Sequence, residues 1–137
     1  MLTDGRGVPV GLVVAGANCN DFKLLRATLE SVVVKRPRPT RAAPQGLCLD
    51  KGYDYAEIYA LLAEFRFTAH VRARGEEAAA KRMRGHRARR WVVERTHSWT
   101  NRFRALLVRW EKMTANYLAS LHLACAYTCF KRAGLLR

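Results

Sequence analysis

Short apolar runs that alternate with amphipathic segments are the feature that most limits how this chain can fold. Residues 46–49 form an apolar run typical of a buried strand, and the run ends directly before Asp50. A helix with apolar residues at helical spacing follows, and Asp54 is a suitable N-cap for it. Residues 67–71 are a plausible further strand. Strands that alternate with helices predict an α/β fold, with a mixed sheet flanked by helices.

The N-terminal residues extend the same pattern. Turn-forming residues at positions 4–7 precede a segment, residues 8–14, in which apolar side chains alternate. This combination predicts a hairpin turn followed by a strand. A helix is then expected from Asn20 or Asp21 to about Val34, because apolar residues recur there at helical spacing.

Two long helices are expected at the C-terminal end, stacked on the sheet. The first is amphipathic and runs from about Arg90 to Trp110, and the second covers Thr114 to Lys131. The residues between 74 and 89 are basic and punctuated by glycine, which predicts a loop. The buried stripe of the first helix is expected to comprise Val92, Thr96, Trp99, Phe103, Leu106 and Trp110.

The charge of the chain favours a polyanionic partner. Lys and Arg number 25 against 11 acidic residues in 137, which gives a formal net charge of +14. Such an excess on a small folded domain is self-repulsive unless a polyanion neutralises it, so nucleic acid is the leading class of partner. Residues 81–90 are the densest part, with six Lys or Arg and no acidic residue. Phosphate contacts of this kind give affinity without reading sequence.

Localisation follows mainly from what is missing. The first residues lack a basic segment followed by an apolar core, so no signal peptide is expected. Residues 113–130 carry no formal charge, but polar side chains interrupt them, and a buried helix explains them better than a membrane span. The four cysteines form no CxxC pair, which fits a reducing compartment. We therefore expect a cytoplasmic protein, without a membrane.

Two carboxylates are candidates for chemistry. Asp50 follows a predicted strand, and the C-terminal ends of strands are where open α/β sheets place reactive groups. Glu94 shares a polar face of the 90–110 helix with Arg90, His97 and Asn101. Each has an ordinary explanation, Asp50 as a cap or turn residue and Glu94 as the partner of Arg90 in an ion pair. Together, on a basic surface, they are also consistent with two ligands that hold Mg²⁺ against a phosphodiester.

Several short phrases of the sequence occur in an order that is more specific than any one of them. They are DGRGVP at 4–9, DKGYD at 50–54, RWVVERT at 90–96 and WTNRFR at 99–104. In this combination the chain resembles bacterial insertion-sequence transposases of the DDE type, over nearly its whole length. The resemblance implies an RNase H-like fold in which three carboxylates bind two divalent ions, Mg²⁺ or Mn²⁺, for DNA cleavage and strand transfer at element ends.

The same resemblance assigns roles to individual residues. The second Asp of the family falls on Asp50 and its Glu on Glu94, so both would be metal ligands. Arg90 matches the Arg that lies four positions before that Glu, where it would contact DNA phosphate or orient the carboxylate. The complete set expected to bind phosphate is Arg90, Lys51, Arg87, Arg95 and Arg102.

The chain also departs from the family pattern. The first catalytic Asp of the family lies upstream of the turn at Asp4, so we expect residues 1–137 to be one N-terminally truncated catalytic domain with little or no activity alone. A Tyr common in the family is replaced by Arg87, and a common basic residue by Asn101. The expected partners are DNA, the missing N-terminal segment and other transposase protomers, and the resemblance implies a location at the bacterial nucleoid. The sequence fits either the C-terminal frame of a split element or a decayed remnant.

Other functions remain open at this stage. A helix-turn-helix module over residues 94–129 is disfavoured because both predicted helices are too long for that motif. A regulatory remnant that binds element ends or full-length protomers is the main alternative to an enzyme. His122, Cys125 and Cys129 share one helix face, but three ligands on one helix are better explained as packing than as a metal site. We also expect exposed apolar surface and poor solubility for the isolated chain.

Overall fold

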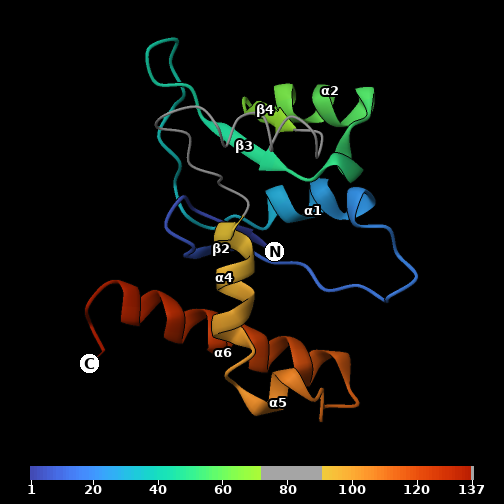
Figure 1. Cartoon of the computed structure of the whole chain (residues 1–137), viewed down its shortest axis with the longest axis vertical. Coiled ribbons are helices and arrows are strands. Elements are labelled where there is room, and N and C mark those ends of the chain that lie inside the picture. The colour runs from blue at the N-terminus through green and yellow to red at the C-terminus, as the bar shows by residue number, and fades with distance from the viewer. Residues whose placement is uncertain (72–90, 137) are drawn as a thin grey trace.

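The computed structural model describes residues 1–71 and 91–136 and begins with a β-hairpin (Figure 1). Strands β1 (Leu2–Thr3) and β2 (Pro9–Gly11) pair antiparallel around the predicted turn. The turn is closed by Asp4, whose carboxylate accepts hydrogen bonds of 2.8 Å from the backbone N–H groups of Arg6 and Val8. The strand predicted over residues 8–14 is shorter than expected, because the chain turns away after Gly11 and the Leu12 N–H donates to the Ser31 hydroxyl instead.

The first helix is also shorter than predicted. A 3₁₀ turn, η1 (Asp21–Leu24), leads into α1 (Leu25–Glu30), which ends before the expected limit at Val34. Asn20 occupies the N-cap position but makes no side-chain capping bond. The Ser31 hydroxyl donates to the Thr28 carbonyl, and a β-branched run follows, so both features favour an end at this point.

The predicted strand–helix–strand segment is present. Strands β3 (Gly46–Leu49) and β4 (Thr68–Val71) pair in parallel, joined by helix α2 (Ala56–Glu64). The prediction that Asp54 caps this helix is wrong. Tyr55 holds the N-cap position without a side-chain bond, and Asp54 accepts a 2.9 Å hydrogen bond from the Tyr59 hydroxyl. The core between α1, β3 and α2 consists of Leu25, Leu29, Leu47, Ile58 and Leu62.

The helix predicted from residue 90 to Trp110 is broken in two. Helix α4 (Trp91–Thr100) ends where the Thr100 hydroxyl turns back to the His97 carbonyl, and helix α5 (Arg104–Leu107) follows after Phe103. Thr and Asn at the break are weak helix formers because their side chains compete for backbone hydrogen bonds. The buried stripe is therefore interrupted, and Trp110 is 66% exposed.

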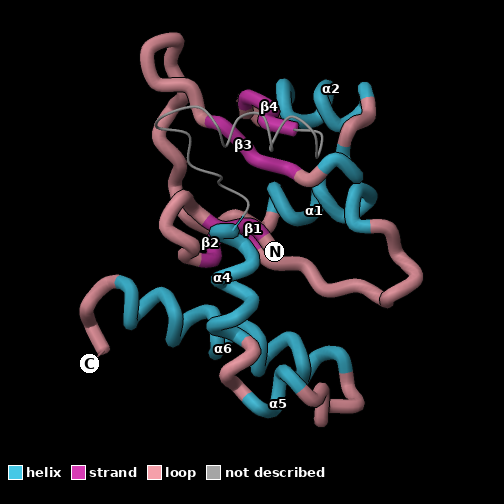
Figure 2. Tube along the Cα trace, in the orientation of Figure 1, coloured by secondary structure: helices cyan, strands magenta, loops and turns pink. Residues whose placement is uncertain are grey.

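Helix α6 (Thr114–Arg132) matches its predicted limits to within one residue. It packs Leu121 and Ala124 against Leu106 in a second core. Helix α4 contacts both α6 and the hairpin, and α6 also contacts β2 directly (Figure 1). In Figure 2 the helices, in cyan, make up much more of the fold than the short strands, in magenta. No helix of the described residues is long and apolar enough to cross a membrane.

The α/β class is confirmed as a mixed α/β architecture, but the single mixed sheet is not observed. The described strands form two separate two-stranded sheets, one antiparallel and one parallel. Helix α1 lies between the hairpin and the β3–β4 pair and contacts β2 (Figure 2).

Candidate functional site

Asp50 lies where the sequence places it, directly after β3. It is exposed, and its carboxylate accepts a 2.7 Å hydrogen bond from the Lys51 N–H at the start of a short 3₁₀ turn, η2 (Lys51–Tyr53). The extended backbone of Asp50 at this cap directs the chain away from the sheet. Asp50 is therefore a cap, as one of its two interpretations predicts. It is also an exposed carboxylate at the C-terminal end of a parallel strand.

A second carboxylate, Asp21, comes close to Asp50. The two residues line one cavity of about 280 Å³, together with Tyr53 and the residues around η1 and η2. Burial raises the pKa of the Tyr53 hydroxyl, and the negative charges of Asp21 and Asp50 raise it further. Tyr53 is thus close enough to be affected by the charges of both carboxylates, which lie 29 positions apart along the chain.

Helix α4, which carries Glu94, is fastened to the hairpin turn. Thr96 is fully buried, and its hydroxyl lies 2.7 Å from the Gly7 carbonyl oxygen and 3.1 Å from that of Val92. The guanidinium of the preceding residue, Arg95, also donates a hydrogen bond to the Arg6 carbonyl. These bonds set the rotation of α4 about its axis, so the exposed side chain of Glu94 points away from the hairpin.

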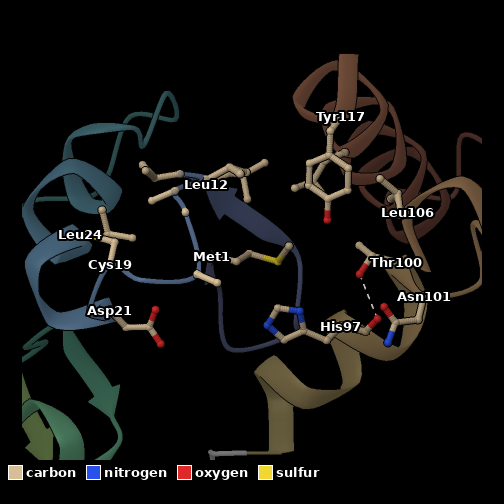
Figure 3. A pocket seen from close by; sticks show the side chains of 16 residues that line it. Met1, Leu12, Cys19, Asp21, Leu24, His97, Thr100, Asn101, Leu106 and Tyr117 are labelled. Carbon is tan, nitrogen blue, oxygen red and sulfur yellow. Dashed lines mark hydrogen bonds between the residues drawn. The ribbon is translucent and has the colours of Figure 1, made fainter. Parts of the chain in front are cut away.

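The polar face of α4 borders a second cavity. This cavity of about 340 Å³ is lined by His97, Thr100 and Asn101 from α4, and again by Asp21. In Figure 3 the His97 imidazole and the Asp21 carboxylate enter it from opposite sides, with Met1 between them. Burial lowers the pKa of His97, and the positive charge of the N-terminal amine lowers it further.

Asp21 lines both cavities. One extends from Asp21 to Asp50, and the other from Asp21 to the helix face on which Glu94 lies one turn before His97. Asp50 and Glu94 do not line a common cavity. Glu94 lines neither of these two cavities, so they do not bring the two predicted residues together.

Comparison with known proteins identifies the family. A model of the transposase DDE domain matches residues 1–129. The chain belongs to the DDE transposase family. It is also 33% identical over 138 residues to a transposase described for the insertion sequence element IS402 of Burkholderia cepacia, a match that covers 95% of this chain. The chain spans 61% of the length of that relative. No solved structure matches.

The resemblance inferred from the sequence phrases is thus confirmed. In a DDE transposase the metal is held by carboxylates, and oxygen ligands of this kind suit Mg²⁺. Among residues 1–71 and 91–136, no group of three His, Cys, Asp or Glu side chains is close enough to hold an ion. Asp50 and Glu94 therefore have the right chemistry, but the described residues do not complete a two-ion site.

The basic residues expected to bind phosphate differ in their surroundings. Lys51 and Arg102 are exposed, whereas the guanidinium of Arg95 is engaged by the hairpin and lies 4.9 Å from the centre of the Trp99 ring. Arg87 and Arg90 lie outside the described residues, as does the rest of the basic run at 81–90.

Sequence reasoning missed Asp21 as part of the site and considered it only as a helix cap. A carboxylate after a Gly-Ala-Asn loop, at the start of a helix that follows a strand, was the available signal. The packing explanation for the three residues on one face of α6 is confirmed for Cys125, which is buried, and fits Cys129, which is half-buried with its thiol 3.7 Å from the Pro9 carbonyl oxygen. It is wrong for His122, which is exposed.

Proposed function

We propose that this chain is part of the RNase H-like catalytic domain of an insertion-sequence transposase, which cleaves DNA at element ends and joins it to target DNA. The observation that carries the proposal is the exposed Asp50 carboxylate, which follows the parallel strand β3 directly and shares a cavity with a second carboxylate, Asp21. Membership of the DDE family supports the chemistry. The whole of residues 1–137 is taken as one domain.

Asp50 and Glu94 are proposed as ligands of divalent metal ions, Mg²⁺ or Mn²⁺. Bound ions would supply charge neutralisation at the scissile phosphodiester. By the family pattern, the third carboxylate would be the first catalytic Asp, which lies upstream of the turn at Asp4. Repulsion between two ions about 4 Å apart makes a shared carboxylate necessary, so the chain alone is expected to be inactive or nearly so.

DNA phosphate is proposed to contact the exposed basic side chains of Lys51, which directly follows Asp50, and Arg102, eight positions after Glu94. Arg87 and Arg90 belong to the same proposed set. Arg95 is proposed to act through the hairpin, since its guanidinium already donates to the Arg6 carbonyl. Its effect on DNA would come from the orientation of α4.

The test is Mn²⁺-dependent nicking of a supercoiled plasmid, by the chain alone and by the chain joined to an upstream segment that carries the first Asp of the family. Nicking is expected only with the added segment, and Asp50→Asn or Glu94→Gln should abolish it. Glu57→Gln, an exposed acid in the first turn of α2, is the matched control and should leave nicking unchanged.

Two results would contradict this function. Nicking that survives both Asp50→Asn and Glu94→Gln would exclude these residues as metal ligands. No nicking by the completed protein, with salt-sensitive DNA binding retained, would favour the alternative, a non-catalytic DNA-binding or regulatory remnant. That alternative predicts that Asp50→Ala and Glu94→Ala leave DNA binding intact.

A further inference from the structure

Trp110 is a large aromatic side chain left in solvent. Its relative exposure is 66%, because the break after α4 removes it from the buried stripe that the sequence predicts. The Arg109 backbone just before it adopts a left-handed conformation, with φ of 46°, which turns the chain between α5 and α6. An exposed Trp at a sharp turn contributes little to the core, so packing does not explain its position.

The surroundings of Trp110 are basic. The Arg104 guanidinium lies 5.9 Å from the centre of the indole ring, within the range of a cation–π contact. Arg102, Arg109 and Lys112 are exposed nearby in the sequence, and Glu111 is the one acid between residues 102 and 112. We call residues 102–113 the Trp110 surface. Figure 1 places its helix, α5, at the end of the molecule opposite α2.

This combination has a specific binding chemistry. Basic side chains attract the phosphate backbone of any nucleic acid, but they do not require an exposed aromatic ring. A ring such as that of Trp110 can stack on a base only when the base is not already stacked within a duplex. Cations beside an exposed ring are therefore suited to unpaired bases more than to intact double-stranded DNA.

We propose that the Trp110 surface binds unpaired bases of single-stranded DNA, with Trp110 as the stacking residue and the flanking cations on the phosphates. The inference deepens the proposed function, because it takes DNA as the partner. It assigns no part in cleavage to Trp110. Exposed Leu107, Val108 and Met113 lie on the same surface, so a protein partner is the competing occupant.

The experiment compares the Kd of the full chain for three fluorescent ligands of equal length: an oligothymidine, the matching duplex, and an abasic strand that keeps the phosphates without bases. Trp110→Leu keeps an apolar side chain and removes the ring. It should weaken oligothymidine binding about 5- to 150-fold and change duplex and abasic binding less than about twofold. Leu123→Ala, at an apolar residue of α6 that is 72% exposed and lies outside the Trp110 surface in sequence, is the matched control and should change none of them.

Two further measurements guard against a general defect. Trp110→Phe should restore most of the lost affinity, because it returns an aromatic ring. The slope of log Kd against log salt should be the same for Trp110→Leu and the wild type, since the indole neutralises no phosphate. Equal weakening on all three ligands would overturn the proposal, because the loss would then concern phosphate contacts or folding.

The remaining outcomes separate this proposal from the proposed function. An unchanged Kd of Trp110→Leu for oligothymidine, with wild-type binding intact, would refute stacking and favour a protein partner, while leaving DNA as a partner. A wild-type chain that binds none of the three ligands would overturn both. Neither result depends on nicking, which tests Asp50 and Glu94 separately.

Discussion

Replacement of Gly7 by Ala should loosen the attachment of α4 to the hairpin. Gly7 is buried and adopts a left-handed backbone conformation, with φ of 81°. A Cβ atom there would lie 3.0 Å from both the Arg95 Nη2 and the buried Thr96 Oγ1. These are the two side chains that bind the hairpin turn, so one added methyl group opposes both contacts and the backbone conformation together.

The expected magnitude comes from three contributions. A left-handed conformation costs a residue with a Cβ about 1–2 kcal/mol. Displacing Thr96 from the Gly7 carbonyl forfeits a hydrogen bond worth roughly 0.5–1.5 kcal/mol net. The lower entropy of the unfolded Ala chain returns about 0.4–1 kcal/mol. The free energy of unfolding should therefore fall by about 2 kcal/mol, or Tm by roughly 8 °C.

The assay is urea unfolding of Gly7→Ala beside Gly5→Ala, a neighbour in the same turn. An added Cβ at Gly5 would meet nothing within 4 Å, and Gly5 has no left-handed φ. Gly5→Ala should leave the free energy of unfolding unchanged or raise it slightly, with the same m value. Equal stability of the two variants would refute the reasoning, because the hairpin would then not be fixed against α4 by these contacts.

Two other predictions concern the same helix. Thr96→Val keeps the shape of the side chain but leaves the Gly7 carbonyl without its 2.7 Å partner, and the free energy of unfolding measured in urea should fall by about 1–3 kcal/mol; a loss as small as that of Thr100→Val, near the end of α4, would contradict it. The pKa of His97 is lowered from 6.5, so the folded state binds fewer protons than the unfolded state just below that pH. Stability should therefore fall as the pH decreases below 6.5, and thermal unfolding of His97→Gln should show a weaker pH dependence; identical pH profiles would exclude His97 as the cause.

Local pattern was enough to predict the elements that depend on local signals. The hairpin turn follows from Asp4 and the glycines after it, because an Asp carboxylate can accept from backbone N–H groups two and four residues on. The strands β3 and β4 follow from short apolar runs, and α6 from a long stretch without Pro or internal Gly. Asp50 was placed correctly for the same reason, since its position depends only on where β3 ends.

The break between α4 and α5 could not be predicted in this way. The apolar spacing continues through residues 92–110, so periodicity alone favours one helix. Contacts with residues far along the chain favour two helices instead. The bend lets Phe103 and Leu106 pack into the core with Leu121 of α6. The exposure of Trp110 follows from that bend. Because the apolar spacing does not show the bend, the sequence predicted Trp110 to be buried.

Asp21 shows the same limit within the site. Its sequence neighbours suggest a cap, and nothing in them says that it faces Asp50. Its position is set by the docking of α1, where Leu25 and Leu29 enter a core with α2 and Arg26 forms a two-bond ion pair with Glu64, at 2.8 and 2.6 Å. That pair joins residues 38 positions apart. Contacts at such separation leave no periodic signal in the sequence. The position of Asp21, which lines both cavities, therefore follows only from the packed arrangement of the helices.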